Sequence, residues 1–329
     1  MAQTARSENG VPSFSFCFNR RFSSEELASS FQTYGLVVLR DFFSREKLAS
    51  FQKTLVHLFH LQGMKIGEYR QLLQAAIQSE SDDGKRLSKI NEILEPRDKE
   101  ALYQVQKMLP SSLGLKSLFW DESFQSVCRS LLGSEEATCL LDGPALFVNR
   151  PRTERLLYKW HSEAHYYPKR RRFLNIWFPL FDSKSEHNGA MSVKLGSHHL
   201  HDVPFAEYRG YNKDSQDKAN YFIQYEVPEN FVAGLPEFYT EASPGDLVIF
   251  HRKLIHRSNP NFSDEYSFAG VARVWDPSQD LTLAGNLAVT PYGGDIGRPD
   301  LVVAAETEIP TETTKGTFVN SCPEVLHES

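Results

Sequence analysis

The chain has 329 residues, of which 40% are hydrophobic and 24% charged, and its formal net charge is −6. These values fit one large or two small globular domains with ample apolar material for a core, and they give no general basis for binding nucleic acid or an anionic membrane. No stretch approaches the roughly 20 apolar residues of a membrane span. The opening MAQTARSENG lacks the apolar segment of a secretory signal, so a cytoplasmic protein is expected.

The four cysteines are scattered along the chain without metal-ligand spacing; they are Cys17, Cys128, Cys139 and Cys322. We interpret them as free thiols of a reducing compartment rather than as a zinc site or a disulfide framework. Aromatic residues reach 12% of the chain, which mildly favours strands.

The first third of the chain has mostly helical signals. Residues 1–22 are polar and mixed, and a loose arm is expected there. Ser23 and Glu26 have the spacing of a capping box and predict a helix to about Tyr34. The apolar run at 35–40 predicts a buried strand. Ser44 can cap the next helix, whose apolar residues recur at helical spacing, and residues 65–133 continue in the same character.

After about residue 134 the pattern changes to short apolar runs separated by Gly, Pro, Asn and Asp. These runs cover residues 140–141, 145–148, 173–178, 191–193, 247–250 and 268–275. Helices followed by many short strands predict an α+β fold, in which a helical layer supports a β-sandwich or barrel. The predicted domain spans residues 23–280, helix-rich over 23–133 and β-rich over 134–280. Residues 281–329 form either a lid or a mobile tail.

The segment KWHSEAHYYP, residues 159–168, carries the clearest chemical signal. On a strand, His161 and Glu163 would face the same side and could reach one metal ion. Alone, such a pair is more often an ordinary surface feature. His256 favours the metal-site interpretation over the surface one, because it follows the turn at 244–246 and the apolar strand at 247–250. Two histidines and one carboxylate form a facial triad, which leaves positions open on Fe(II).

Four stretches, taken together, resemble the phytanoyl-CoA dioxygenase-like family of Fe(II)/2-oxoglutarate-dependent oxygenases. They are FQTYGLVVLRDFFSREKLASFQ, WHSE, NGAMSVKLGSHH and PGDLVIFHRKLIHRSNPNFS, which occur in the family's order over about residues 23–275. The resemblance implies a double-stranded β-helix, or jelly roll, with helices packed outside. It also implies that His161, Glu163 and His256 hold the iron, with 2-oxoglutarate as co-substrate and O2 as oxidant. Glu163 stands where an aspartate is commoner in the family, and it argues against halogenase chemistry.

A second departure concerns the co-substrate. The family usually has an arginine 11 residues after the distal histidine, whereas this chain has Ser267, which lacks the charge for bidentate carboxylate pairing. The candidates for holding 2-oxoglutarate are Lys159, Asn175, Ser267 and Arg273, and Arg171 or Arg172 could also reach inward. Arg273 shares the strand parity of Ser267 but lies about 20 Å farther along the strand.

The predicted substrate contacts are His165, Tyr166, Tyr167 and Trp177. On an extended chain His165 would lie about 13 Å from His161, too far to share a metal, so it is placed in the pocket or in structural packing. Trp177 and Asn175 would share one strand face and point into the barrel. His198, His199 and His201 are left out of the site, because the family's Gly-Ser-His turn is mostly structural.

The expected function is oxidation, most often hydroxylation, of a C–H bond in a small organic molecule, with release of succinate and CO2. Two alternatives remain at this stage. One is a non-catalytic jelly-roll binding protein that lost co-substrate binding at Ser267. The other is a mononuclear metal enzyme that does not use 2-oxoglutarate. The substrate and the oligomeric state are left open.

Overall fold

The structure is a computed structural model that describes most of the chain up to residue 276. The described residues are 5–6, 12–13, 16–19, 22–65, 67–97, 99–109, 112–134, 139–140, 145–153, 157–167, 172–211 and 221–276. The predicted lid or tail at 281–329 and Cys322 lie outside them. Cys17 and Cys128 are free thiols, as predicted.

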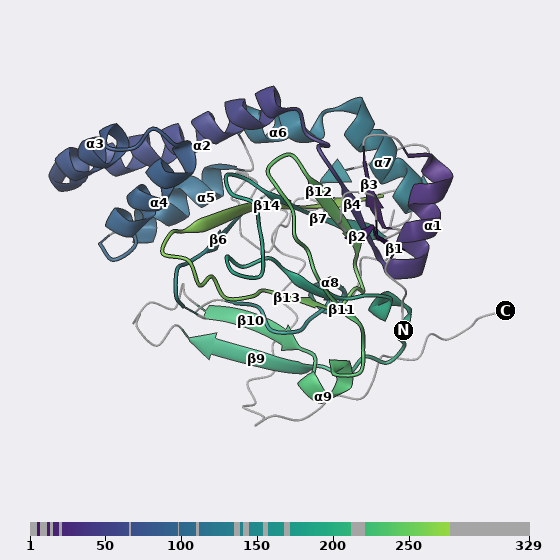
Figure 1. The fold of residues 1–329 in the computed structure, drawn as a ribbon. Helices are drawn as coiled ribbons and strands as arrows, with labels where there is room; N and C mark the ends of the chain where they lie inside the picture. Colours follow the sequence, from purple (N-terminus) through teal and green to yellow (C-terminus); the bar gives the residue numbers. More distant parts are fainter. Residues whose placement is uncertain are drawn as a thin grey trace, which may run out of the picture.

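A layer of helices lies along one side of the molecule (Figure 1). It contains α1 (Ser24–Tyr34), α2 (Arg45–Met64), η1 (Gly67–Tyr69), α3 (Arg70–Gln78), α4 (Asp83–Leu94), α5 (Lys99–Met108), α6 (Leu113–Phe119) and α7 (Glu122–Leu132). The predicted capping box is confirmed, because Glu26 N donates to Ser23 Oγ and Ser23 N donates to the Glu26 carboxylate. Ser44 caps α2 as predicted.

The larger sheet has seven strands in the order β3-β4-β12-β7-β14-β5, with β6 paired to β14. Its members are β3 (Cys17–Phe18), β4 (Leu36–Leu39), β5 (Cys139–Leu140), β6 (Ala145–Asn149), β7 (Phe173–Pro179), β12 (Leu247–His251) and β14 (Ser267–Trp275). All pairs are antiparallel except β3 with β4. The early strand β4 thus lies beside the late strand β12, which joins the two ends of the domain.

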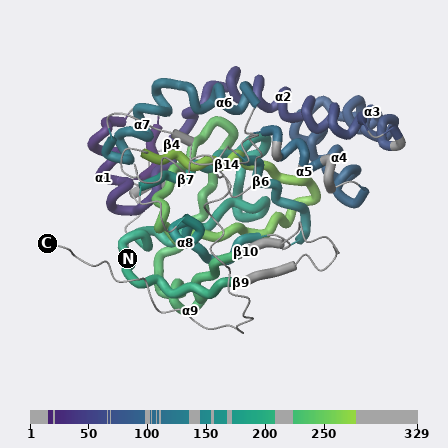
Figure 2. Tube along the Cα trace, turned by 180° about the vertical axis from the view of Figure 1, so that it is seen from behind, coloured from purple at the N-terminus to yellow at the C-terminus, as the bar shows by residue number. Residues whose placement is uncertain are grey.

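A smaller sheet faces the first one and carries part of the site. It has the order β11-β8-β13, with β8 (Ser192–Lys194), β11 (Glu237–Tyr239) and β13 (His256–Arg257). The remaining elements are β1 (Ala5–Arg6), β2 (Pro12–Ser13), α8 (Glu163–Tyr166), η3 (Ser197–His199), β9 (Ala206–Tyr211), β10 (Tyr221–Glu226) and α9 (Glu229–Val232). Both Figure 1 and the reverse view in Figure 2 show β9 and β10 on the side away from the long helices.

Alternate residues of the large sheet belong to two separate cores. On β7 and β14, Ile176, Phe178, Phe268 and Ala272 pack with the helices. Their neighbours Trp177 and Ala269 pack instead with Val193 of the smaller sheet and with Met191 and Ala242, which lie beside that sheet in the chain. This alternation follows from the two-residue period of a strand. It identifies the second set as the interior of a barrel, and the predicted α+β jelly roll with outer helices is confirmed.

Two local expectations are wrong. The arm at 1–22 is not loose throughout, because Phe16 is 1% exposed and Cys17–Phe18 extends the large sheet beside β4. The chain is also not extended after Ser162, because Glu163–Tyr166 forms one helical turn. None of the described helices has the length and apolar character that a bilayer crossing demands.

Candidate metal centre

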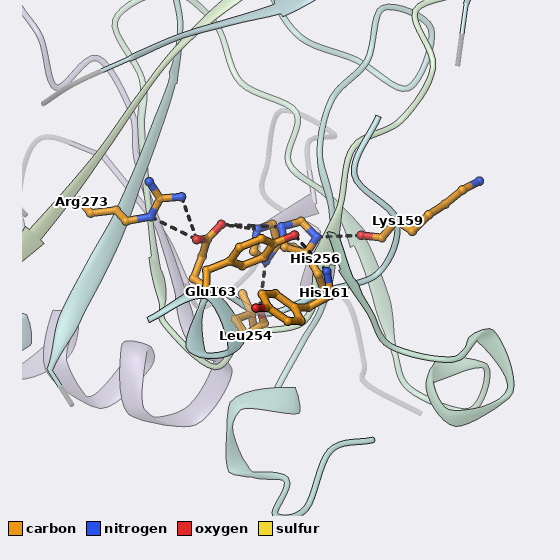
Figure 3. A network of polar contacts seen from close by, with 8 residues as sticks. Lys159, His161, Glu163, Leu254, His256 and Arg273 are labelled. Atoms are coloured by element: carbon orange, nitrogen blue, oxygen red, sulfur yellow. Dashed lines mark hydrogen bonds and ion pairs between the residues drawn. The ribbon is translucent and has the colours of Figure 1, made fainter. Parts of the chain in front are cut away.

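Three buried side chains that can ligate a metal converge at one end of the barrel. One ligand atom from each of His161, Glu163 and His256 lies within 4.8 Å of the others. Figure 3 shows the three side chains pointing toward one another. His161 precedes α8, Glu163 opens it and His256 opens β13. Within the described part of the chain, this is the group of His, Cys, Asp and Glu residues with a geometry that could hold an ion.

The two histidines are brought together by the backbone as well as by their side chains. His161 N donates to His256 O and His256 N donates to His161 O, both at 2.9 Å. This pair forms an isolated antiparallel bridge, and the ring centroids are 4.1 Å apart. A contact between residues 95 positions apart in the chain therefore does not depend on flexible side chains alone.

Each histidine has its Nδ1 hydrogen-bonded to a main-chain carbonyl. The distances are 2.7 Å from His161 Nδ1 to Lys159 O and 2.9 Å from His256 Nδ1 to Leu254 O (Figure 3). With the proton on Nδ1, each Nε2 keeps its lone pair for a metal. The two Nε2 atoms face Glu163 Oε1 at 3.6 and 3.7 Å. Burial lowers the pKa of His256 and the charge of His161 adds to this, which favours the neutral ligand form.

Arg273 binds the Glu163 carboxylate on the side away from the two histidines. The guanidinium donates to Oε2 from Nε at 3.1 Å and from Nη2 at 2.7 Å. Burial alone would raise the pKa of Glu163, but the Arg273 charge and the two facing histidines outweigh it and hold the pKa well below its usual range. Oε1 is thus the oxygen that faces the histidines, and it is ionised. Two imidazoles and one hard anionic oxygen fit an Fe(II) ion.

A sequence profile of the family described as phytanoyl-CoA dioxygenase (PhyH) matches residues 31–267. The chain belongs to this family. It is accordingly an Fe(II)/2-oxoglutarate-dependent oxygenase, and Fe(II) and 2-oxoglutarate are its cofactor and co-substrate. No curated protein matches the sequence.

The chain is similar to several solved structures. EctD from S. alaskensis with bound Fe is 20% identical, with 78% of each chain covered and a TM-score of 0.50. ThoJ, described as a non-heme monooxygenase, is 16% identical, with 76% of this chain and 77% of that chain covered and a TM-score of 0.46. The epimerase SnoN, in complex with Fe3+, alpha ketoglutarate and nogalamycin RO, is 14% identical, with 77% and 83% covered and a TM-score of 0.43.

At position 267, where the family usually has an arginine, the structure shows contacts that were not predicted from the sequence. Ser267 is 2% exposed, and its hydroxyl accepts a hydrogen bond from Lys184 Nζ. Lys184 was not among the predicted site residues. Its burial depends on a backbone bridge to Ala242, 58 positions later, and no local sequence pattern signals such a pairing.

The other co-substrate candidates are distributed differently. Asn175 is buried on the barrel face of β7, opposite Arg273, and its Nδ2 has no hydrogen-bond partner among the described residues. Arg273 is engaged with Glu163 rather than placed near Ser267. Lys159 corrects an expectation: only its carbonyl joins the network, while the exposed side chain points away (Figure 3). Arg172 is exposed, and Arg171 lies outside the described residues.

The aromatic candidates border the ligand set without joining it. Tyr166 lies edge-on to His161 with ring centroids 5.8 Å apart, and its hydroxyl accepts from Tyr225 N. Tyr167 lies against the Arg273 guanidinium, 5.0 Å from the ring centroid. Trp177 is 5% exposed in the barrel interior.

His165 stands apart from the three candidate metal ligands. Its ring packs on Phe205 with centroids 4.2 Å apart. Burial, helped by the charges of His161 and Arg252, lowers the pKa of His165 to about 4, so it is neutral at physiological pH. The reason given from the sequence was wrong, however, since the segment is a helical turn rather than extended.

Proposed function

We propose that this enzyme hydroxylates a C–H bond of a small organic molecule at an iron held by His161, Glu163 and His256, with conversion of 2-oxoglutarate to succinate and CO2. The observation that carries the proposal is the buried ligand set, in which both imidazoles have their Nδ1 atoms tied to carbonyls and their Nε2 atoms facing Glu163 Oε1. A facial triad of this kind leaves positions open for further ligands.

When bound, iron supplies the coordination of the keto acid and the activation of O2. The chain's own residues determine the orientation of the carboxylate ligand. Arg273 fixes Oε2 and leaves Oε1 toward the histidines. Asn175, on the neighbouring strand and the same face, offers a buried N–H donor with no partner in the described residues. Such a donor is costly to bury unpaired, so we assign it to an acceptor oxygen of the co-substrate or substrate.

The substrate is proposed to lie on the side of α8, between this turn and β10. Tyr166, Tyr167 and His165 come from α8 or directly after it, and Tyr225 of β10 packs against Tyr166 with ring centroids 4.8 Å apart. Neutral His165 would offer a hydrogen bond rather than a charge. These side chains favour a substrate with an apolar or planar part. Trp177 would contact whatever part of a ligand enters the barrel.

The test is anaerobic titration with Fe(II), followed by measurement of succinate formed from 2-oxoglutarate and O2. His161→Ala and His256→Ala are each expected to abolish both tight iron binding and succinate formation, because each removes one of three ligands. His187→Ala is the matched control, since this exposed histidine lies outside the ligand set. If either ligand variant keeps full iron affinity, the assigned site is wrong. Iron binding without succinate formation would favour a binding protein.

A further inference from the structure

Lys184 is a buried lysine inside the barrel end that lies away from the ligand set. It is 2% exposed, and its Nζ donates a hydrogen bond to Ser267 Oγ. Its backbone is fixed by Lys184 N to Ala242 O at 2.7 Å and Ala242 N to Lys184 O at 3.2 Å. The side chain is therefore held in place from a segment separate from β14.

The charge of this lysine is not balanced within the described residues. No carboxylate forms an ion pair with Nζ, and Asp182 acts on it only through its charge. Burial lowers the pKa of Lys184 to about 7, and Asp182 offsets only part of this shift. A buried ammonium group with a single neutral acceptor is unfavourable. An anion bound beside Nζ would supply the missing counter-charge.

The position of Ser267 connects Lys184 to the site. Ser267, Ala269, Val271 and Arg273 alternate on one face of β14, and Ala269 lies in the core between the two sheets. Arg273, at one end of this face, contacts Glu163. Ser267 and Lys184 lie at the other end of this face, and buried apolar residues that include Trp177 and Val248 belong to the core into which the face points. A ligand that chelates the metal at one end would meet a cation at the other.

We propose that Lys184 binds the distal carboxylate of 2-oxoglutarate, with Ser267 as its hydrogen-bonding partner, in place of the arginine that the family usually has at position 267. This inference rests on the proposed function. The cation comes from the segment after β7 instead of from β14, so the charge is kept although its position in the sequence has changed.

Other described cations are less suitable. Arg273 already pairs with Glu163. Lys194 is also buried, but it is bound to Glu237 at 3.0 Å and lies over the Trp160 ring. Its neighbour Val193 belongs to the barrel interior, so Lys194 points to the opposite face of β8. Lys194 therefore provides a matched control for the loss of a buried lysine.

The experiment measures 2-oxoglutarate binding to the Fe(II)-loaded protein by calorimetry under anaerobic conditions, which separates binding from turnover. Lys184→Met is expected to weaken binding about 10- to 100-fold, because a charge-assisted hydrogen bond is lost. Iron affinity is expected to be unchanged, and the melting temperature of the ligand-free protein unchanged or higher. Lys194→Met is expected to keep the wild-type affinity for 2-oxoglutarate.

Two further measurements distinguish carboxylate recognition from general packing. The preference for 2-oxoglutarate over 2-oxopentanoate, which lacks the distal carboxylate, is expected to collapse in Lys184→Met. The double variant Lys184→Met/Ser267→Arg is expected to recover affinity by restoring the arginine. Unchanged affinity and preference in Lys184→Met would overturn the role of Lys184 alone. No binding of 2-oxoglutarate by the iron-loaded wild type would overturn both this inference and the proposed function.

Discussion

Glu163 illustrates how one added methylene can be accommodated at the proposed metal centre. The longer side chain lets Oε2 reach the guanidinium of Arg273 while Oε1 still faces both histidines. The arginine stacks in turn on Tyr167. The departure from the family's commoner aspartate is therefore accompanied by a specific partner, and Oε1 is the oxygen that would hold the metal.

The first prediction concerns this partner. Arg273→Met is expected to lower iron affinity about 10- to 100-fold, because the carboxylate loses the group that orients and ionises it. Arg273→Lys is expected to lose less, since an ammonium keeps the charge but cannot reproduce the two donors. Anaerobic Fe(II) titration measures both variants. If Arg273→Met keeps the wild-type affinity for iron, Arg273 does not position the Glu163 carboxylate.

At the scale of elements, the turn between α1 and β4 depends on one glycine. Gly35 ends α1 with φ of 72°, and a Cβ placed there would lie 2.4 Å from His198 Nδ1. His198 cannot easily move, because its Nε2 is hydrogen-bonded to Gln32 O and its ring packs between His199 and His251. Within its described contacts, His198 thus has a structural role, consistent with leaving it out of the site.

The second prediction tests this turn with a matched pair of glycines. Gly35→Ala is expected to destabilise the protein by about 2 to 3 kcal/mol, from left-handed backbone strain together with the clash. Gly133→Ala is the control, because Gly133 ends α7 with φ of 62° but has nothing within 4 Å of the added Cβ. That variant should cost only about 1 kcal/mol. Denaturant unfolding compares them, and equal losses would contradict the steric part of the argument.

At the scale of the whole molecule, Lys184 links folding stability to pH. In the folded protein burial lowers its pKa to about 7, whereas a lysine in the unfolded chain titrates near 10.4. Between these values the unfolded state binds more protons. Stability contributed through Lys184 therefore rises with pH across this window and is lowest below pH 7. The charge of Asp182 acts on the pKa of Lys184. The charges of Asp82, Glu265 and Lys85 act in turn on the pKa of Asp182.

The third prediction follows from the direction of this pH dependence. The free energy of unfolding of the wild type, relative to Lys184→Met, is expected to increase as the pH is raised from about 7 to about 10. The comparison cancels groups that titrate in both proteins. Added 2-oxoglutarate should reduce the slope, because a bound anion keeps the lysine protonated. A difference that stays flat with pH would mean that Lys184 is not a depressed titrating group.

The fold could be predicted from the sequence, and so could the convergence of the three candidate ligands, for different reasons. Strand and helix periods are local, and so is the His161–Glu163 spacing, while His256 could be added because a turn and a strand precede it. The arrangement around Lys184 and Arg273 was not predictable, because it arises from contacts with Ala242 and Glu163 far away in the chain. The turn at Glu163–Tyr166 was missed because its aromatic residues oppose helix locally, and the tertiary context overrides them.

The position of β4 has a consequence for synthesis of the chain. Its partner β3 is made shortly before it, with only α1 between them, but its other partner β12 follows more than two hundred residues later. At about 5–20 residues per second, a nascent chain would hold β4 without β12 for roughly 10 to 40 s. All four β4 residues are buried in the finished fold, so an uncovered β4 would be open to pairing with other chains. Helix α1 is made before β4 and helix α2 soon after it, and both contribute side chains to the core that contains Val37 and Leu39. The helical layer can thus protect a newly made strand until the barrel closes.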